Sequence, residues 1–296
     1  MTSTWGRKLT PGNDTKAFAT AISPPKTVSN DIVSRVKTAM DHPDGNFKRA
    51  DELKQFIHDP KAFEGGREWS PVEKNELKKA EADYKEIQLE KQNIKTSLDR
   101  IDLLFNEKSL QSTKLSEDAR NIEYKINEID NHLSQYDEKL KSLKEKGDYK
   151  TEEDIAWEIE ANQKISKLIS KKTDLSSSLT KIQSLQLNLN DAEKTITKEL
   201  EKLLGGGGPR PKGPSGPQSA EAINSEMAEI KRDVFSLSAS IREIFDDAYN
   251  LFSKLFESIT NISSKIESQF KSANATLAES TTLLDNYPAH TMQNRM

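Results

Sequence analysis

The sequence predicts an all-α protein: an elongated coiled coil with a long helical hairpin, a separate oligomerising helix and a flexible N-terminal arm. Apolar residues recur at alternating steps of three and four over roughly nine heptads, and Gly and Pro concentrate in one stretch between two long helical segments. Of the 296 residues, 33% are hydrophobic and 31% are charged. So few apolar residues cannot fill a large globular core, but they can fill a narrow seam between helices.

The N-terminal part of the chain is predicted to hold two segments. Residues 1–30 are rich in Thr, Ser, Pro, Lys and Asn, and they have too few apolar side chains to offset the entropy of ordering, so we expect a flexible arm. Residues 31–68 contain two short amphipathic stretches separated by "HPDGN" and stopped by Pro60, which indicates a short helical hairpin. Such a hairpin is too small for a core of its own, so we expect it to dock on something or to fold on binding.

Residues 70–204 are predicted to form a long coiled-coil hairpin. Its first helix begins with a capping box made by Ser70 and Glu73. From Leu77 to Leu143 the apolar residues follow a strict seven-residue repeat, which implies a left-handed supercoil. In this helix we predict an oligomerisation seam that contains Ile94, Leu98, Ile101, Phe105, Ile122, Ile126, Ile129 and Leu133.

A turn near Gly147 is predicted to reverse the chain, with Thr151 and Asp154 starting the second helix of this hairpin. A short turn between two seamed helices most simply makes them antiparallel neighbours. The second helix is shorter than the first. The far end of the first helix must therefore be covered by another chain or by the hairpin of residues 31–68.

Residues 205–218 are predicted to be a Gly/Pro linker, and residues 219–285 a second coiled-coil helix followed by a tail at 286–296. A flexible linker of this length spans roughly 20 Å and uncouples the last helix from the hairpin. Ile recurs at both seam positions of the last helix, which favours a trimer or a tetramer. The predicted seam of this helix contains Ile223, Met227, Ile230, Val234, Leu237, Ile241, Ile244, Leu251 and Leu255.

No pattern in the sequence indicates catalysis, so we expect no enzyme, no catalytic residue, no cofactor and no metal site. The chain has no Cys, and its four His residues lack the spacing of metal ligands. The stretch "GGGGPRPKG" lacks the Gly-Lys-Ser/Thr ending of a phosphate-binding loop. Pro211, Pro214 and Pro217 leave open a polyproline ridge for an SH3-type groove.

Charge and hydropathy give no support to two other classes of partner, nucleic acids and the membrane interior. The 44 basic and 48 acidic residues are mixed along the chain, without the basic excess of a nucleic-acid binder. No run approaches eighteen apolar residues, so we expect no membrane span. The N-terminus lacks the apolar stretch of a signal peptide, so we expect a cytoplasmic protein.

These observations predict a non-catalytic homo-oligomeric scaffold that tethers protein partners through its ends. One alternative is a helical effector or translocator that acts at a membrane through the aromatic stripe of residues 241–259. A second alternative comes from the order of segments, which is similar to that of the phosphoprotein cofactors of negative-strand RNA virus polymerases. This likeness lies in layout alone, and it implies a cofactor of polymerase and nucleocapsid.

Overall fold

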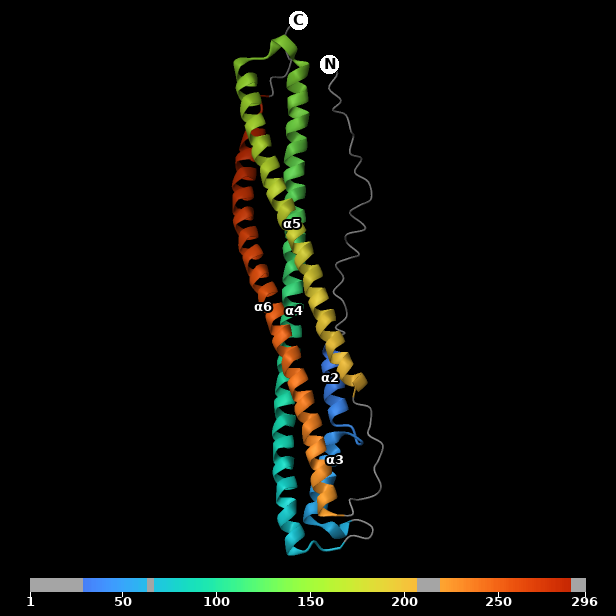
Figure 1. The fold of residues 1–296 in the computed structure, drawn as a ribbon. Coiled ribbons are helices and arrows are strands. Elements are labelled where there is room, and N and C mark those ends of the chain that lie inside the picture. The colour runs from blue at the N-terminus through green and yellow to red at the C-terminus, as the bar shows by residue number, and fades with distance from the viewer. Residues whose placement is uncertain (1–28, 63–66, 207–218, 289–296) are drawn as a thin grey trace, which may run out of the picture.

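The computed structural model describes residues 29–62, 67–206 and 219–288, and within these ranges it is all-α, as predicted. The predicted arm up to residue 28, the linker from residue 207 and the tail from residue 289 lie outside the described residues. Figure 1 shows an elongated rod, and α4 alone is about 110 Å long. The elements are α2 (Ser29–Met40), α3 (Asn46–His58), η1 (Pro60–Ala62), α4 (Pro71–Glu145), η2 (Gly147–Tyr149), α5 (Glu152–Gly206) and α6 (Ala220–Asp285).

The predicted capping box starts α4. The Glu73 backbone N–H donates to Ser70 Oγ over 3.3 Å, and the Ser70 backbone N–H donates to a Glu73 carboxylate oxygen over 2.9 Å. The Arg67 guanidinium and the hydrogen bonds with Ser70 lower the pKa of Glu73 to about 2. This carboxylate therefore stays ionised and satisfies a backbone donor that the first helical turn leaves unpaired.

The long helices α4 and α6 run parallel in one register (Figure 1). Residues 148 apart in sequence meet at both ends of the pair: Asn224 Nδ2 donates to the Glu76 carbonyl over 3.1 Å, and His132 contacts Ser280. Helix α5 runs antiparallel to them. Its Lys172 pairs with Asp130 of α4, whereas Glu193, further along α5, pairs with the earlier Lys108. These three helices form one bundle.

Where α5 ends, α3 takes its place against α4 and α6 (Figure 1). Its apolar face is buried, and its polar groups hold both neighbours: Arg49 pairs with Glu226 of α6 over 2.6 Å, and Tyr84 of α4 donates to Asp51 over 2.8 Å. Helix α2 packs beside it on α4 and α5. Of the two coverings expected for the far end of the first helix, this structure contains the 31–68 hairpin.

The predicted seam residues lie in the core of this single chain. Twelve of the seventeen are buried, and Ile126, Leu133, Leu237 and Leu255 are half-buried. Leu251 is the exception, because 41% of it is exposed and the neighbouring Phe252 is completely buried in its stead. The Phe252 ring meets Phe105 edge-on at 6.1 Å between centroids, so the core shifts by one residue to accept an aromatic side chain.

The sequence predicts that α6 is separate from the hairpin of α4 and α5, but in the structure it is not. It packs along α4 and α5 of the same chain. A heptad pattern identifies which face of a helix is buried, but the same pattern arises whether the covering helices belong to one chain or to several. The predicted trimer or tetramer therefore stays a prediction.

Candidate functional site

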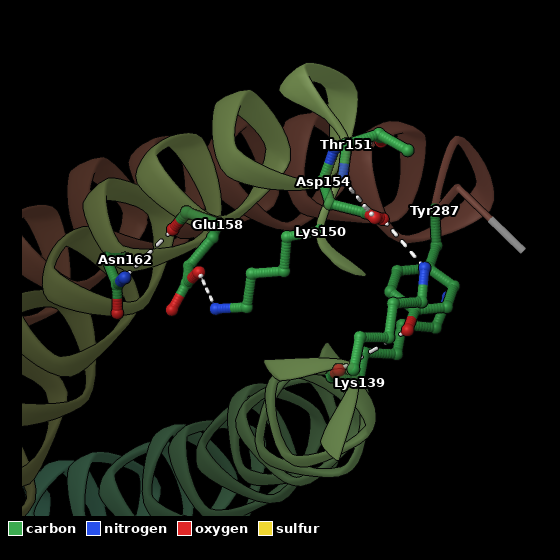
Figure 2. Close-up of polar contacts among 8 residues, drawn as sticks. Lys139, Lys150, Thr151, Asp154, Glu158, Asn162 and Tyr287 are labelled. Atoms are coloured by element: carbon green, nitrogen blue, oxygen red, sulfur yellow. Dashed lines mark hydrogen bonds and ion pairs between the residues drawn. The ribbon is translucent and has the colours of Figure 1, made fainter. Parts of the chain in front are cut away.

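Buried polar and aromatic side chains gather at the end of the rod where α4 turns into α5 and α6 ends. Figure 2 shows this end, which we call the turn end. Three helices converge here through contacts between residues far apart in sequence. Apart from Leu133, which directly follows His132, the predicted seam residues line the core further along the rod.

The reversal between α4 and α5 is fixed by backbone and charge together. Gly147 adopts φ of 55°, a left-handed conformation that glycine accepts without strain. Thr151 and Asp154 form the predicted start of α5 by exchanging hydrogen bonds of 3.0 and 3.1 Å. Lys146 pairs with Asp154 over 2.8 Å, although the Asp154 side chain is only 1% exposed.

The Asp154 carboxylate is ionised in spite of its burial. Burial alone raises its pKa, but the hydrogen bond from Lys146 and the bonds with Thr151 outweigh that effect, so its pKa is lowered. Lys150 adds a second pair across the turn, with Glu158 at 2.7 Å (Figure 2). The turn is therefore a rigid, charge-paired cap on the bundle.

An aromatic cluster joins the end of α6 to this cap. The Trp157 ring lies between Tyr136 and Tyr287, with centroid distances of 6.0 and 5.0 Å. The Trp157 indole Nε1–H donates to the Leu283 carbonyl over 2.9 Å. The Lys139 ammonium lies over the Tyr287 ring and donates to the Leu284 carbonyl. The last turn of α6 is thus held by both other long helices.

One Ser–His pair is present at this end. His132 Nδ1 lies 2.8 Å from Ser280 Oγ, and burial lowers the pKa of this histidine. A serine needs contact with a substrate to act as a nucleophile, yet Ser280 is 0% exposed. Tyr136 also donates to the Ser280 carbonyl, over 3.3 Å. In this structure the pair connects α4 to α6.

Beside the cluster, a groove of about 590 Å³ runs between the first turns of α5 and the last turns of α6. We call it the end groove. The sequence did not predict this groove, although two signals were visible in it. Trp157 lies near the predicted start of one helix, and Tyr287–Pro288 follow the predicted end of another. The groove is lined by Glu153, Ala156, Trp157, Glu160, Lys164, Glu279, Thr282, Leu283, Asn286 and Pro288.

The described residues bear on metals and membranes too. Nowhere in residues 29–62, 67–206 and 219–288 do three or more His, Asp or Glu side chains gather in a way that would hold a metal ion. No helix in those ranges combines the length and the apolar character needed to cross a bilayer. Within the aromatic stripe of residues 241–259, Phe252 is buried and Phe245 and Phe256 are half-buried in the bundle.

Comparisons with protein-family models, with curated proteins and with solved structures found no match.

Proposed function

We propose that this protein is a non-catalytic scaffold: a rod that works inside the cell and holds protein partners at its two ends, a fixed distance apart. The observation that carries the proposal is the constant register of α4 and α6. Contacts at an offset of 145 to 148 residues run from Glu76 to Lys139, a length of about 95 Å. Because the bundle keeps one register along this length, it holds its two ends a fixed distance apart.

The two ends differ in a way that suits different partners. The turn end carries the end groove and exposed apolar side chains at Ile155 and Ile159. The opposite end carries α3 and the first turn of α4, where Val72 is 70% exposed. Apolar side chains that remain in water after folding are candidates for contacts with other proteins.

Self-association belongs to the proposal as contact between complete rods. The seam residues that favoured a trimer or a tetramer are covered within the chain. The outer face of α4, by contrast, carries a row of side chains spaced by multiples of seven residues and exposed by 62 to 71%: Leu89, Leu103, Leu110 and Tyr124. The face of a helix that points to water is normally polar, so this row favours contact with a second copy.

Photo-crosslinking in the native cell tests the scaffold. A photoreactive amino acid is placed at Val72, at Ile159 or, as a control in the middle of the rod, at the exposed Lys181 of α5, which lies outside the row on α4. We expect different proteins to be captured at the two ends and neither at Lys181. Equal capture from all three positions, or a compact particle by small-angle X-ray scattering, would contradict the proposal.

Light scattering tests the oligomeric part separately. We expect a multimer whose mass falls to that of the 33.4 kDa chain when Leu103 and Leu110 are both replaced by Lys. If the wild-type protein is already a monomer at micromolar concentration, the proposed self-association is wrong, whereas the proposed binding of partners at the ends is not affected.

A further inference from the structure

We infer that the outward-facing side of α5 binds the N-terminal segment of the same chain, residues 1–28. Three observations carry this inference: this side has no charge, most of its polar side chains are bonded within the helix, and α2 begins beside it and points along it. Residues 1–28 lie outside the described residues, so the structure provides the receiving surface and the point at which the segment joins α2.

The outward-facing side of α5 is exposed and uncharged. Ten exposed residues follow one another at steps of three or four from Ile155 to Leu187; four are Ile or Leu, and six are Ser, Thr or Asn. Because 31% of the chain is charged, about three charged residues are expected among any ten, and more on an exposed surface. The exposed charged residues of this stretch, such as Lys167, Asp174 and Lys181, fall outside these steps. We call the ten residues the α5 face.

Most polar side chains of the α5 face are bonded within their own helix. Four of the six donate to the backbone carbonyl four residues earlier, over 2.8 to 3.1 Å: those of Asn162, Ser166, Thr173 and Thr180. A donor that is already bonded stays satisfied when the face is covered. The four Ile and Leu side chains are 48 to 65% exposed, and they gain by leaving water. The face therefore suits an uncharged segment with apolar side chains.

Helix α2 begins beside α5 and points its N-terminus along the rod. Lys37 pairs with Asp99 over 2.6 Å, whereas the later Asp41 pairs with the earlier Lys91 over 2.8 Å, so α2 runs antiparallel to α4. Its first residue, Ser29, therefore points toward the turn end. Helix α2 also packs on α5 (Figure 1). The chain before α2 thus starts next to α5 and on the way to the α5 face.

The length of the N-terminal segment matches the α5 face. The pairing of α4 with α2 and α5 puts Ser29 level with α5 residues near 194, so Leu187 lies about 10 Å further toward the turn end. Residues 23–28 reach at most about 20 Å when extended, so Ile22 can contact that end of the face. The seventeen residues from Ile22 back to Trp5 reach at most about 58 Å, whereas the face is about 48 Å long.

The composition of the segment matches the face as well. Of the seventeen residues 9–25, two are charged. The large apolar side chains of the segment are those of Trp5, Leu9, Phe18 and Ile22. Because a few residues tether this segment to α2, it meets the face at an effective concentration on the order of millimolar. The segment therefore occupies the face at an affinity that would be too weak for a separate protein.

The bound segment has a consequence for the turn end. It covers Ile155 and Ile159, the exposed apolar side chains at which we propose that a partner protein binds. This consequence rests on the proposed function: the N-terminal segment and the partner compete for the same side chains.

Engineered disulfides test where the segment lies. The chain has no cysteine, so Ala19→Cys together with Thr180→Cys creates one pair, between the segment and the α5 face. The control pair joins Ala19→Cys with Lys271→Cys, an exposed position of α6 at the same distance along the rod. In the full-length protein with oxidised glutathione, we expect the first pair to close at least about tenfold faster than the control pair. Equal rates overturn the inference.

Two charge substitutions locate the contact. Ile169→Lys puts a charge on the α5 face, and we expect it to slow the first pair at least about fivefold, because a covered charge is costly. Ser268→Lys puts the same charge on the exposed side of α6 and leaves the rate unchanged. Both positions are exposed, and circular dichroism verifies that each variant is folded. An equal effect of the two substitutions contradicts binding at the face.

Mixed chains test which copy supplies the segment. One chain carries Ala19→Cys and the other carries Thr180→Cys. If a disulfide between these two chains forms faster than the disulfide within one chain, the occupant is the segment of a second copy, and the assignment to the same chain is wrong.

Removal of residues 1–28 tests the competition. With a photoreactive amino acid at Ile159, we expect the shortened chain to capture at least about threefold more partner than the full chain, and we expect no change at Val72. Capture at Ile159 that does not change overturns the competition. Absence of capture at both ends, with and without residues 1–28, refutes the scaffold, whereas the disulfide rates still decide whether the segment binds the α5 face.

Discussion

Lys108 is a charged residue in the middle of an apolar seam, and its partner determines the stability of the bundle. Its side chain is 6% exposed, and its ammonium lies 2.7 Å from a Glu193 carboxylate oxygen and 3.0 Å from Asn190 Oδ1. Glu193→Ala leaves the ammonium buried with one neutral acceptor. Breaking a fully buried pair costs roughly 3–5 kcal/mol. Because the Glu193 side chain is 20% exposed, water compensates part of the loss, and we expect about 2–3 kcal/mol.

Replacing the other member of the pair, Lys108, tests whether the cost comes from the lost ion pair or from the unpaired buried charge. Lys108→Met keeps the length of the side chain and removes the buried ammonium, so we expect stability within about 1 kcal/mol of the wild type, or above it. Urea unfolding followed by circular dichroism at 222 nm measures both changes from the transition midpoint. Lys194→Ala is the control, because its pair with Asp191 is 3.6 Å long and exposed on both sides. The reasoning is refuted if Lys108→Met costs as much as Glu193→Ala.

Other substitutions test the rest of the structure. Ile230 is 0% exposed, so Ile230→Asp buries an unpaired charge, and we expect a loss of about 4 kcal/mol or more in one cooperative thermal transition; two separate transitions would show that α6 unfolds by itself. Burial lowers the pKa of His132, so the folded state favours the neutral imidazole. The stability that this gives is present above the unfolded pKa of about 6.5 and is lost as pH falls through the lower folded pKa. We therefore expect His132→Gln to flatten the decline of melting temperature below pH 6.5. Trp157→Phe leaves the Leu283 carbonyl without its donor, and we expect a loss of about 1–2 kcal/mol together with faster amide hydrogen exchange in the last turns of α6.

Local signals in the sequence were sufficient for the helices and their ends. The capping residues Ser70 and Thr151 and the turn at Gly147 are found where their local chemistry predicts them, since each acts within a few residues of its own position. The seven-residue repeat also identified the buried faces. It did not identify the covering helices, because register is set by pairs such as Lys231 with Asp83, which lie 148 residues apart.

The polar residues that interrupt the α4 seam mark the places where other helices contact α4, and the sequence alone does not show which helices these are. Lys91 interrupts the seam because α2 and α3 meet α4 there: it pairs with Asp41 over 2.8 Å and lies over the Phe47 ring. Lys108 interrupts it where Glu193 of α5 approaches. The turn end was missed for the same reason, since Tyr136, Trp157 and Tyr287 come together only in the folded rod.

The linker between α5 and α6 gives the sharpest test of this architecture. The pairing of α4 with α5 puts the end of α5 level with α4 residues near 95, whereas the offset of 148 puts the start of α6 level with α4 residues near 72. The chain must therefore cover roughly 35 Å along the rod between residues 204 and 219.

With residues 205 and 206 unwound from the end of α5, the fourteen residues 205–218 reach at most about 50 Å when extended, which exceeds this distance. Replacing all of them by Gly and Ser keeps that reach, and we expect an unchanged melting temperature and mass, since loop closure depends weakly on composition once a chain is flexible. Deleting eight residues reduces the reach to about 24 Å, which is too short. Helix α6 must then unwind at its start, slide out of its register with α4, or pair with α4 of another copy. Circular dichroism detects the first outcome, and light scattering the last. A cysteine pair replacing Asp83 and Lys231, which crosslinks only in the native register, detects the second. A deleted chain that keeps its helix content, its mass and this crosslink would mean that α6 does not start where the structure has it.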